Sequence, residues 1–160
     1  MKSLSLARAI ALAAPLLLLG GAYASQYVGG LHPCEMCWWQ RYPHFAAIPL
    51  ALAAYALRRR PCVSALFAGL AGVAIATSGG IGLFHAGVEY GWWKGLTACS
   101  TSPAGGGADI LNQIMAAPIT RCDVAPWTLL GISLAGYNAL LSGAAALAIL
   151  ALLIKGRKEA

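Results

Sequence analysis

The sequence predicts an all-α integral membrane protein, a bundle of four helices that cross the bilayer. The chain of 160 residues is 59% hydrophobic and only 10% charged, whereas soluble domains contain about 25% charged residues. Its apolar residues gather in four long stretches, and about 20 apolar residues are enough to cross a bilayer as a helix. A water-soluble fold of this size could not bury so much apolar surface. We therefore expect one membrane domain over residues 1–160.

The four expected transmembrane helices cover residues 6–28, 38–57, 62–84 and 127–154. The third and fourth stretches contain no charged side chain, and both are long enough to span. The second is apolar only from about residue 43, so it must include Gln40 and Arg41 to cross the membrane. Glycines recur in the third stretch, where small residues let helices approach closely; they are Gly69, Gly72, Gly79, Gly80 and Gly82.

Basic residues predict the orientation of the bundle, because cytoplasmic loops beside membrane helices collect lysine and arginine. Eight of them fall on one side of the expected topology: Lys2, Arg8, Arg58, Arg59, Arg60, Lys155, Arg157 and Lys158. Both termini are therefore expected in the cytoplasm, with loops 29–37 and 89–126 on the outer side. The net charge of +6 then reports topology, and no basic stripe indicates nucleic-acid binding.

The N-terminus also fits a cleaved signal peptide, because Lys2 and Arg8, an apolar run and Ala22-Tyr23-Ala24 follow that pattern. Cleavage would leave the rest of the topology unchanged, so the charges do not separate the two interpretations. The mass of the mature protein would separate the two interpretations.

The longer outer loop, between the third and fourth helices, has two parts. Residues 100–107 are rich in Ser, Thr, Pro and Gly and are typical of a flexible segment. Apolar residues then recur at helical spacing over 110–115 and end before Pro118. This pattern predicts either a short amphipathic helix on the membrane surface or a loop packed on the bundle.

The distribution of the five cysteines indicates redox chemistry. The topology places Cys34 and Cys37 in the short outer loop, Cys99 and Cys122 in the long one, and Cys62 on the inner side. The outer compartment permits disulfides, whereas the cytosol keeps thiols reduced. A Cys-x-x-Cys element can form an exchangeable disulfide.

Other uses of the Cys-x-x-Cys element fit the sequence less well. A c-type haem site needs His directly after the second cysteine, where this chain has Trp38. Zinc sites show two close pairs or a histidine at regular spacing, which Cys99 and Cys122 do not provide. We therefore expect no metal, and structural disulfides are the simpler alternative for both pairs.

Two side chains near the cysteines are candidates for cofactor binding. Arg41 lies four residues after Cys37, about one helical turn away, where a guanidinium favours a thiolate and could stabilise negative charge on a reduced ring. The alternative is that Arg41 only anchors the helix at the membrane interface. His85 and Glu89 stand one turn apart at the outer end of the third helix, and the histidine could deliver protons. The tryptophans are expected to form an aromatic belt on the outer interface; they are Trp38, Trp39, Trp92, Trp93 and Trp127.

These features together resemble the disulfide bond formation protein B (DsbB) family of quinone-reducing thiol oxidases. The resemblance covers nearly the whole chain: four spans, the segment Pro33-Cys34-Glu35-Met36-Cys37-Trp38-Trp39-Gln40-Arg41-Tyr42, and a second cysteine pair before the last span. Arg121-Cys122-Asp123 followed by Pro126-Trp127 is similar to the family's entry into its fourth helix.

The resemblance implies an electron relay in the bacterial inner membrane, with the active cysteines facing the periplasm. A reduced periplasmic thioredoxin-fold partner, DsbA-like, would attack a disulfide between Cys99 and Cys122, at Cys99. Electrons would pass to Cys34 and Cys37, and the Cys37 thiolate would reduce ubiquinone or menaquinone. Arg41 and His85 would support the quinone, the glycines at 105–107 would let Cys99 move, and Cys62 would have no role.

Two rival functions remain at this stage. A quinone reductase resembling vitamin K epoxide reductase uses similar chemistry in a four-helix bundle, but its redox Cys-x-x-Cys is expected near the last helices, whereas here it precedes the second. A non-enzymatic membrane scaffold would use the cysteines only to staple its outer loops. Loss of disulfide formation in cells after replacement of Cys34 or Cys37 by serine would separate an enzyme from a scaffold.

Overall fold

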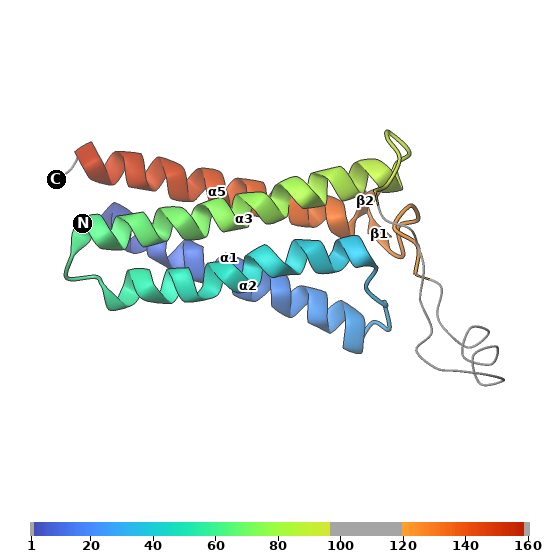
Figure 1. Cartoon of the computed structure of the whole chain (residues 1–160), viewed down its shortest axis with the longest axis horizontal. Coiled ribbons are helices and arrows are strands. Elements are labelled where there is room, and N and C mark those ends of the chain that lie inside the picture. The colour runs from blue at the N-terminus through green and yellow to red at the C-terminus, as the bar shows by residue number, and fades with distance from the viewer. Residues whose placement is uncertain (1, 97–119, 159–160) are drawn as a thin grey trace.

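A computed structural model describes residues 2–96 and 120–158 and contains four long helices in these ranges. They are α1 (Lys2–Tyr27), α2 (Glu35–Ala56), α3 (Pro61–Glu89) and α5 (Leu134–Lys158). The helices run side by side along one axis (Figure 1). The mostly helical architecture that the sequence predicts is therefore confirmed.

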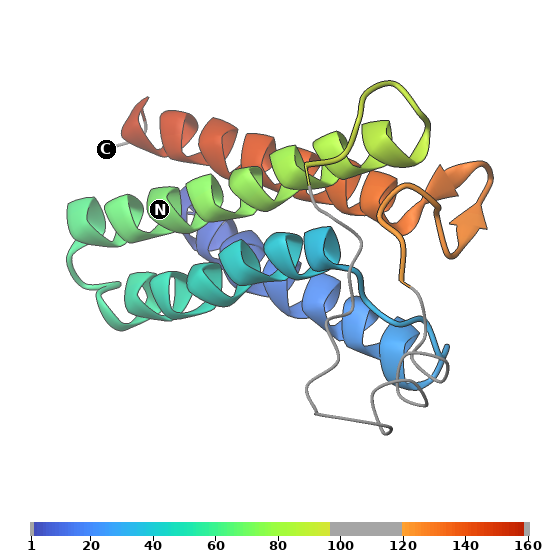
Figure 2. The ribbon, with the colours of Figure 1, turned by 45° about the vertical axis from the view of Figure 1, so that its right-hand side comes forward.

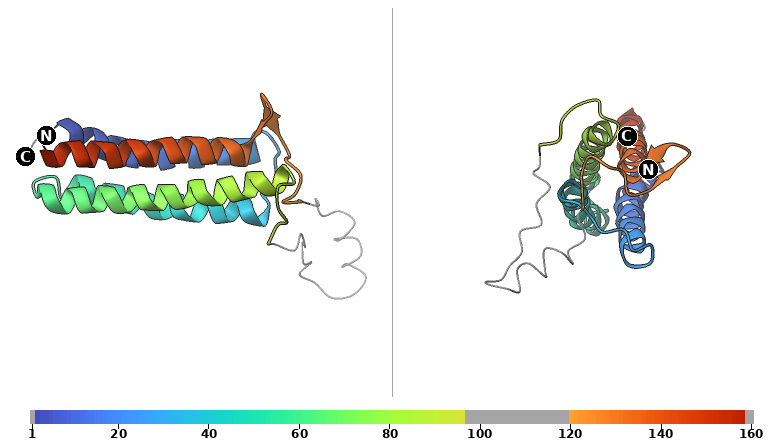
Figure 3. Two further views of the ribbon diagram at one scale, coloured as in Figure 1. Left: turned by 90° about the horizontal axis from the view of Figure 1, so that it is seen from above. Right: turned by 90° about the vertical axis from the view of Figure 1, so that its right-hand side faces the viewer.

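The four helices form a ring in which each packs on two neighbours. α3 packs against α2 and α5, and α1 closes the ring by packing against α5 and α2 (Figures 2 and 3). The core at the middle of the bundle is built largely from small residues; its buried members are Ala11, Ala47, Ala51, Ala71, Ile75 and Ile149. Small side chains let the helix backbones approach closely, as in other membrane bundles.

Three of the helices, α1, α3 and α5, are long and apolar enough to cross a membrane. α2 is 22 residues long and lies alongside them, but it carries Gln40, Arg41 and His44. All three of these side chains are buried. The polar residues of α2 thus face protein rather than the outside of the bundle, which is where polar groups at membrane depth are tolerated.

The glycines of α3 pack against α5, as the sequence suggests for most of them. A Cβ atom added at Gly72 would lie 3.2 Å from Ile149, one at Gly79 would lie 3.1 Å from Ser142, and one at Gly82 would lie 3.0 Å from the carbonyl oxygen of Ala135. Gly80 is the exception, because no atom would lie within 4 Å of its Cβ. Three glycines on one face of α3 therefore set its distance from α5.

Replacing Gly82 by alanine is expected to destabilise the bundle by about 1–3 kcal/mol, because the added methyl group meets backbone atoms that cannot move independently. Gly80→Ala is the matched control, since it adds the same group to the same helix in open space, where alanine is favoured over glycine by about 1 kcal/mol. Thermal unfolding in detergent measures both. Equal midpoints for the two variants would contradict the packing role of Gly82.

A short β-hairpin precedes α5. Strands β1 (Thr128–Leu129) and β2 (Ile132–Ser133) pair antiparallel, with Thr128 opposite Ser133 and Leu129 opposite Ile132. Leu130 and Gly131 form the turn with φ of 52° and 76°, the left-handed conformations that a two-residue hairpin turn requires. The sequence pattern predicts helix from residue 127, whereas α5 begins at Leu134, because the hairpin takes up the residues between.

Hydrogen bonds fix the hairpin to the ends of α3 and α5. The hydroxyl of Tyr90, just beyond α3, donates to the carbonyl oxygen of Gly131 at 3.1 Å and accepts from the backbone N–H of Ser133 at 3.0 Å. The Ser133 hydroxyl then accepts from the backbone N–H of Gly136 at 3.1 Å, as an N-cap serine does. The segment that follows Cys122 is thereby held against the end of the bundle.

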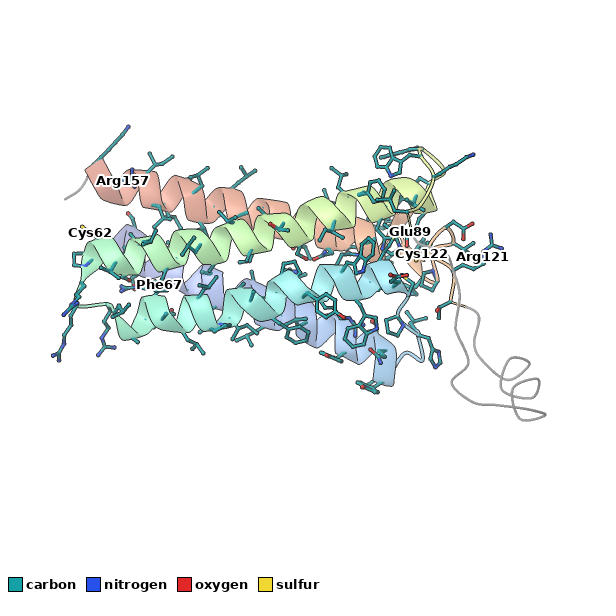
Figure 4. The ribbon with its side chains drawn as sticks, in the orientation of Figure 1. Cys62, Phe67, Glu89, Arg121, Cys122 and Arg157 are labelled. Carbon is teal, nitrogen blue, oxygen red and sulfur yellow. The ribbon has the colours of Figure 1, made fainter. Side chains whose placement is uncertain are left out.

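The two ends of the bundle differ in what they carry. Both termini lie at one end, together with Cys62 and Arg157 (Figures 1 and 4). Glu89, Arg121 and Cys122 lie at the other end, where the hairpin is also found. Cys122 and Cys62 are therefore separated by the length of the bundle, as the sequence predicts.

Candidate active site

The Cys-x-x-Cys pair lies at the N-terminus of α2. Cys34 is the N-cap residue, and its sulfur accepts a hydrogen bond from the backbone N–H of Cys37 at 3.2 Å. Cys37 lies in the first turn, and the two sulfurs are 2.8 Å apart. The unpaired N–H groups at a helix N-terminus favour negative charge. The helix begins three residues earlier than the sequence pattern indicates, and this places Cys37 where a thiolate is stabilised.

The two cysteines differ in exposure and in where the proton resides. Cys34 is buried, with 5% of its surface exposed, whereas Cys37 is partly exposed. The hydrogen bond with Cys37, together with burial, raises the pKa of the Cys34 thiol. The same hydrogen bond lowers the pKa of the Cys37 thiol, so the partly exposed Cys37 is the thiol of the pair that loses its proton more readily.

Cys122 belongs to the same buried cluster as the pair. It is 4% exposed and packs in a cluster with Cys34, Met36 and Val88, although it comes from the segment before the hairpin. The charge of a Cys122 thiolate would act on Cys34. The sequence assigns Cys122 to a pair with Cys99, but Cys99 lies outside the described residues. In the described part of the chain, Cys122 lies beside the Cys-x-x-Cys pair.

His85 reaches the pair from α3. It is 2% exposed, and its Nε2 lies 3.6 Å from the sulfur of Cys34 and 3.7 Å from Oε1 of Glu89. The sequence places His85 and Glu89 one turn apart at the outer end of α3, and the structure brings the histidine directly against Cys34. His85 is therefore the α3 side chain best placed to act on the sulfur chemistry.

Gln40 holds the other side of the His85 ring. Its side-chain nitrogen lies 2.8 Å from Nδ1 of His85 and donates at 3.1 Å to the carbonyl oxygen of Met36. Its side-chain oxygen accepts from Nδ2 of Asn138 at 2.9 Å. Gln40 is a functional residue that the motifs do not identify, although a polar residue within an expected membrane helix is itself a signal of function.

Asn138 of α5 continues this network through the bundle. Its Nδ2 donates to the backbone oxygen of Ser78 at 3.2 Å, while its Oδ1 lies 3.1 Å from Nε2 of His44 and accepts from the Ser142 hydroxyl at 2.9 Å. Hydrogen bonds between membrane helices contribute about 0.6 kcal/mol each on average. The network therefore fixes side-chain orientation across α2, α3 and α5 more than it adds stability.

Arg41 points in another direction, toward α1. Its guanidinium donates to Oε1 of Gln26 at 2.7 Å and to the carbonyl oxygen of Ala22 at 3.3 Å. The rings of Tyr23 and Trp38 each have their centroids 4.9 Å from the guanidinium carbon. The sequence predicts Arg41 one turn from Cys37, which the helix confirms, but Arg41 and His85 lie on different sides of α2.

A cavity of about 510 Å³ lies beside the pair, within the size range of small-molecule sites. Residues from the short loop, α2, α3 and the segment before the hairpin line it, among them Cys34, Cys37, His85, Glu89, Thr120 and Arg121. Oε2 of Glu89 is buried without a hydrogen-bond partner among the described residues. Two sulfurs, an imidazole and a carboxylate thus line one cavity.

The fold supplies the histidine that the sequence spacing did not show next to the cysteines. Cys34, Cys37 and His85 offer three atoms within 4.8 Å of one another, a set that could hold a metal ion. A metal would need a lone pair on the histidine nitrogen that faces the sulfurs. That nitrogen is Nε2, so the position of the ring proton decides between metal binding and hydrogen bonding.

Several predictions from the sequence fall outside the described residues: the position of Cys99, the flexible segment 100–107 and the possible helix over 110–115. Of the other site residues, the structure brings together Cys34, Cys37, Cys122 and His85. Arg41 lies on the side of α2 that faces α1. Cys62 is exposed and lies at the opposite end of the molecule (Figure 4).

Comparison with known proteins agrees with this geometry. Residues 5–152 match the family model described as disulfide bond formation protein DsbB. The chain is 28% identical over 131 residues to the uncharacterized protein RP370 of Rickettsia prowazekii, covering 79% of this chain and 74% of that protein. It is 26% identical over 131 residues to disulfide bond formation protein B of Marinobacter nauticus, covering 76% and 75%. No solved structure matches the chain.

Proposed function

The chain belongs to the DsbB family of disulfide bond formation proteins, and from this premise we propose that it is a quinone-dependent oxidase that reoxidises a periplasmic DsbA-like partner. Family membership implies thiol oxidation and disulfide formation. The observation that carries the proposal is the arrangement of three cysteines and a histidine at one end of the bundle. Cys34 and Cys37 are adjacent, Cys122 is packed beside them, and His85 contacts Cys34.

The different surroundings of the two sulfurs support a division of roles. Cys37 is partly exposed and has a lowered pKa, so its sulfur is the one that reacts with an electron acceptor. Cys34 is buried beside Cys122, so it is the atom that exchanges disulfides with the second pair. Attack of a Cys122 thiolate on a Cys34–Cys37 disulfide forms the Cys34–Cys122 bond, breaks the Cys34–Cys37 bond and leaves Cys37 as a thiolate.

The residues around the cavity fit a quinone headgroup, either ubiquinone or menaquinone. The volume suits one ring, and Cys37, His85 and Glu89 line it. The unpartnered Oε2 of Glu89 is an acceptor that a hydroxyl of the reduced ring can satisfy. A bound quinone supplies the two-electron acceptor, taking two electrons and two protons as the Cys34 and Cys37 thiols become a disulfide.

The protein's own groups position the reacting sulfurs and stabilise their negative charge. The first turn of α2 holds the Cys37 sulfur as a thiolate, and His85 keeps Cys34 within reach of Cys37. Arg41 places a positive charge one turn below Cys37, where it stabilises negative charge at that depth.

The proposed location is the bacterial inner membrane, with the cysteine end of the bundle facing the periplasm and both termini in the cytoplasm. Three helices that are able to span a membrane support the membrane location. The eight basic residues of the terminal segments and the α2–α3 loop support the orientation, and so does the need of a disulfide exchange site for an oxidising compartment.

An anaerobic assay tests this function. Purified protein is mixed with ubiquinone and a reduced DsbA-like thioredoxin-fold protein, and the quinone absorbance is followed together with the thiol content of the partner. We expect one quinone reduced for each disulfide formed in the partner. Absence of quinone reduction with both ubiquinone and menaquinone, in protein that retains its helical content, would refute the proposal.

A further inference from the structure

The hydrogen-bond network around His85 determines which ring nitrogen carries the proton. Two backbone carbonyl oxygens fix the orientation of the amides, because a carbonyl oxygen can only accept. Gln40 directs its nitrogen to the carbonyl oxygen of Met36 at 3.1 Å, and Asn138 directs its nitrogen to that of Ser78 at 3.2 Å. Neither amide can be reversed without placing oxygen against oxygen.

Further contacts support the same orientation. Nδ2 of Asn138 donates to Oε1 of Gln40 at 2.9 Å, which requires oxygen at that position of Gln40. Oδ1 of Asn138 in turn accepts from the hydroxyl of Ser142 at 2.9 Å. The oxygen and the nitrogen of each amide thus both have a partner that fixes their identity. The side-chain nitrogen of Gln40 is therefore the atom that lies 2.8 Å from Nδ1 of His85.

From this we infer that Gln40 is a positioning residue, which keeps His85 neutral with its proton on Nε2, so that His85 donates a hydrogen bond to Cys34 rather than accepting its proton. Nδ1 must accept from the Gln40 amide, and a neutral imidazole then carries its hydrogen on the other nitrogen. That nitrogen faces the sulfur of Cys34 at 3.6 Å and Oε1 of Glu89 at 3.7 Å, and both of these atoms can accept.

This inference deepens the proposed function, on which its chemical meaning rests. When a disulfide that includes Cys34 is cleaved by attack on the other sulfur, the electron pair of the broken bond stays on Cys34, which leaves as a thiolate. Two N–H donors then face its sulfur, the backbone N–H of Cys37 and Nε2 of His85. Charge-assisted hydrogen bonds of this kind are stronger than neutral ones, so departure of Cys34 becomes easier.

The same tautomer disfavours a metal at the three-atom set of Cys34, Cys37 and His85. A divalent cation needs the lone pair of the nitrogen that faces the sulfurs, and Gln40 places the proton there. The amide of Gln40 therefore selects a redox use of the cluster over a metal-binding one.

The experiment compares Gln40→Glu, Gln40→Met and a matched control, Gln26→Glu. A carboxylate at position 40 can only accept, so it draws the proton to Nδ1, whereas methionine removes the donor without replacing it. Gln26→Glu adds the same charge near the site, on α1, where Gln26 contacts Arg41 rather than His85. The ring nitrogens of His85 are observed by ¹⁵N NMR in reduced, quinone-free protein, with His85→Asn used for assignment.

We expect a protonated Nε2 and an unprotonated Nδ1 in the unmodified protein and in Gln26→Glu. The pattern should be reversed in Gln40→Glu and mixed in Gln40→Met. Ionisable side chains packed around His85 are those of Cys34, Cys37, Cys122 and Glu89, so the measurement is repeated in Cys37→Ser.

The second measurement is the alkylation rate of Cys34 in the Cys37→Ser background. In Gln40→Glu the reversed tautomer of His85 no longer donates to Cys34. Alkylation of Cys34 should therefore slow about tenfold at neutral pH, which corresponds to a shift of one unit in the pKa of Cys34. A protonated Nδ1 in the unmodified protein, or an unchanged tautomer in both Gln40 variants, would overturn the inference. The tautomer is read without turnover, so an inactive protein that shows the expected NMR pattern would refute the oxidase function and leave the inference standing.

Discussion

Replacement of Cys37 by serine is expected to abolish quinone reduction, with a loss on the order of 10³-fold or more, because the reacting nucleophile is removed. The variant should also accumulate a disulfide between Cys34 and Cys122. Those two residues are packed in one buried cluster. Attack of the Cys34 thiolate on a Cys99–Cys122 disulfide forms the Cys34–Cys122 bond and releases Cys99, and Cys37 is no longer present to displace that bond.

Stopped-flow measurement of quinone absorbance gives the rate of the first effect, and peptide mapping under non-reducing conditions identifies the disulfide. Cys62→Ser is the matched control, since it makes the same atomic change at an exposed position at the other end of the bundle. It should retain full activity. A Cys37→Ser protein that still reduces quinone at more than about 1% of the normal rate would assign the reaction to another group.

The meeting of Cys34, Cys37 and His85 could be predicted in outline from the sequence. Four spans in alternating direction bring the start of the second and the end of the third to the same side, and this is where the two cysteines and the histidine occur. The direct contact of His85 with Cys34 could not be predicted, because it depends on the rotation of α3 about its axis. That rotation is set by glycines facing α5, such as Gly79 and Gly82.

The hairpin before α5 was missed for a definite reason. Residues 128–133 are mostly apolar, so they read as a continuation of the last span. The turn lacks the Asn-Gly or Asp-Gly pair that usually marks a two-residue hairpin, and Leu130 adopts a positive φ of 52°, which is uncommon for leucine. The contacts of Tyr90 with Gly131 and Ser133 hold the hairpin in place, and they join positions more than 40 residues apart in the sequence.

The network through Gln40 and Asn138 has a signal in the sequence. Gln40 and His44 are four residues apart on α2, and Asn138 and Ser142 are four apart on α5, so each pair lies on one helical face. Polar residues at this spacing within apolar spans indicate an interior contact. Which pair meets which is decided by helix packing, since Gln40 and Asn138 are 98 positions apart.

Replacement of Arg41 by alanine is expected to lower the rate of quinone reduction about 10- to 100-fold and to change disulfide exchange with the partner by less than about threefold. The reason is the placement of its charge. The guanidinium lies on the α1 side of α2, one turn from Cys37, and away from Cys34 and Cys122, between which exchange takes place. Arg41 acts on Cys37 through its charge, and one to two pKa units, about 1.4–2.7 kcal/mol, correspond to the expected range of rates.

The two half-reactions are measured separately: oxidation of the reduced protein by quinone, and reduction of the oxidised protein by the partner. Arg41 is buried and contacts Gln26, Tyr23 and Trp38, so its removal also weakens the packing of α1 on α2. Arg41→Lys therefore accompanies the alanine variant, because it keeps the charge while losing the planar donor geometry. Arg59→Ala, an exposed arginine in the α2–α3 loop, controls for the loss of positive charge alone.

If the lysine variant reduces quinone nearly normally, charge is the property that matters at this depth. If both half-reactions fall equally in Arg41→Ala, Arg41 supports the fold of the helix pair, and the reduced quinone must be stabilised by the groups that line the cavity.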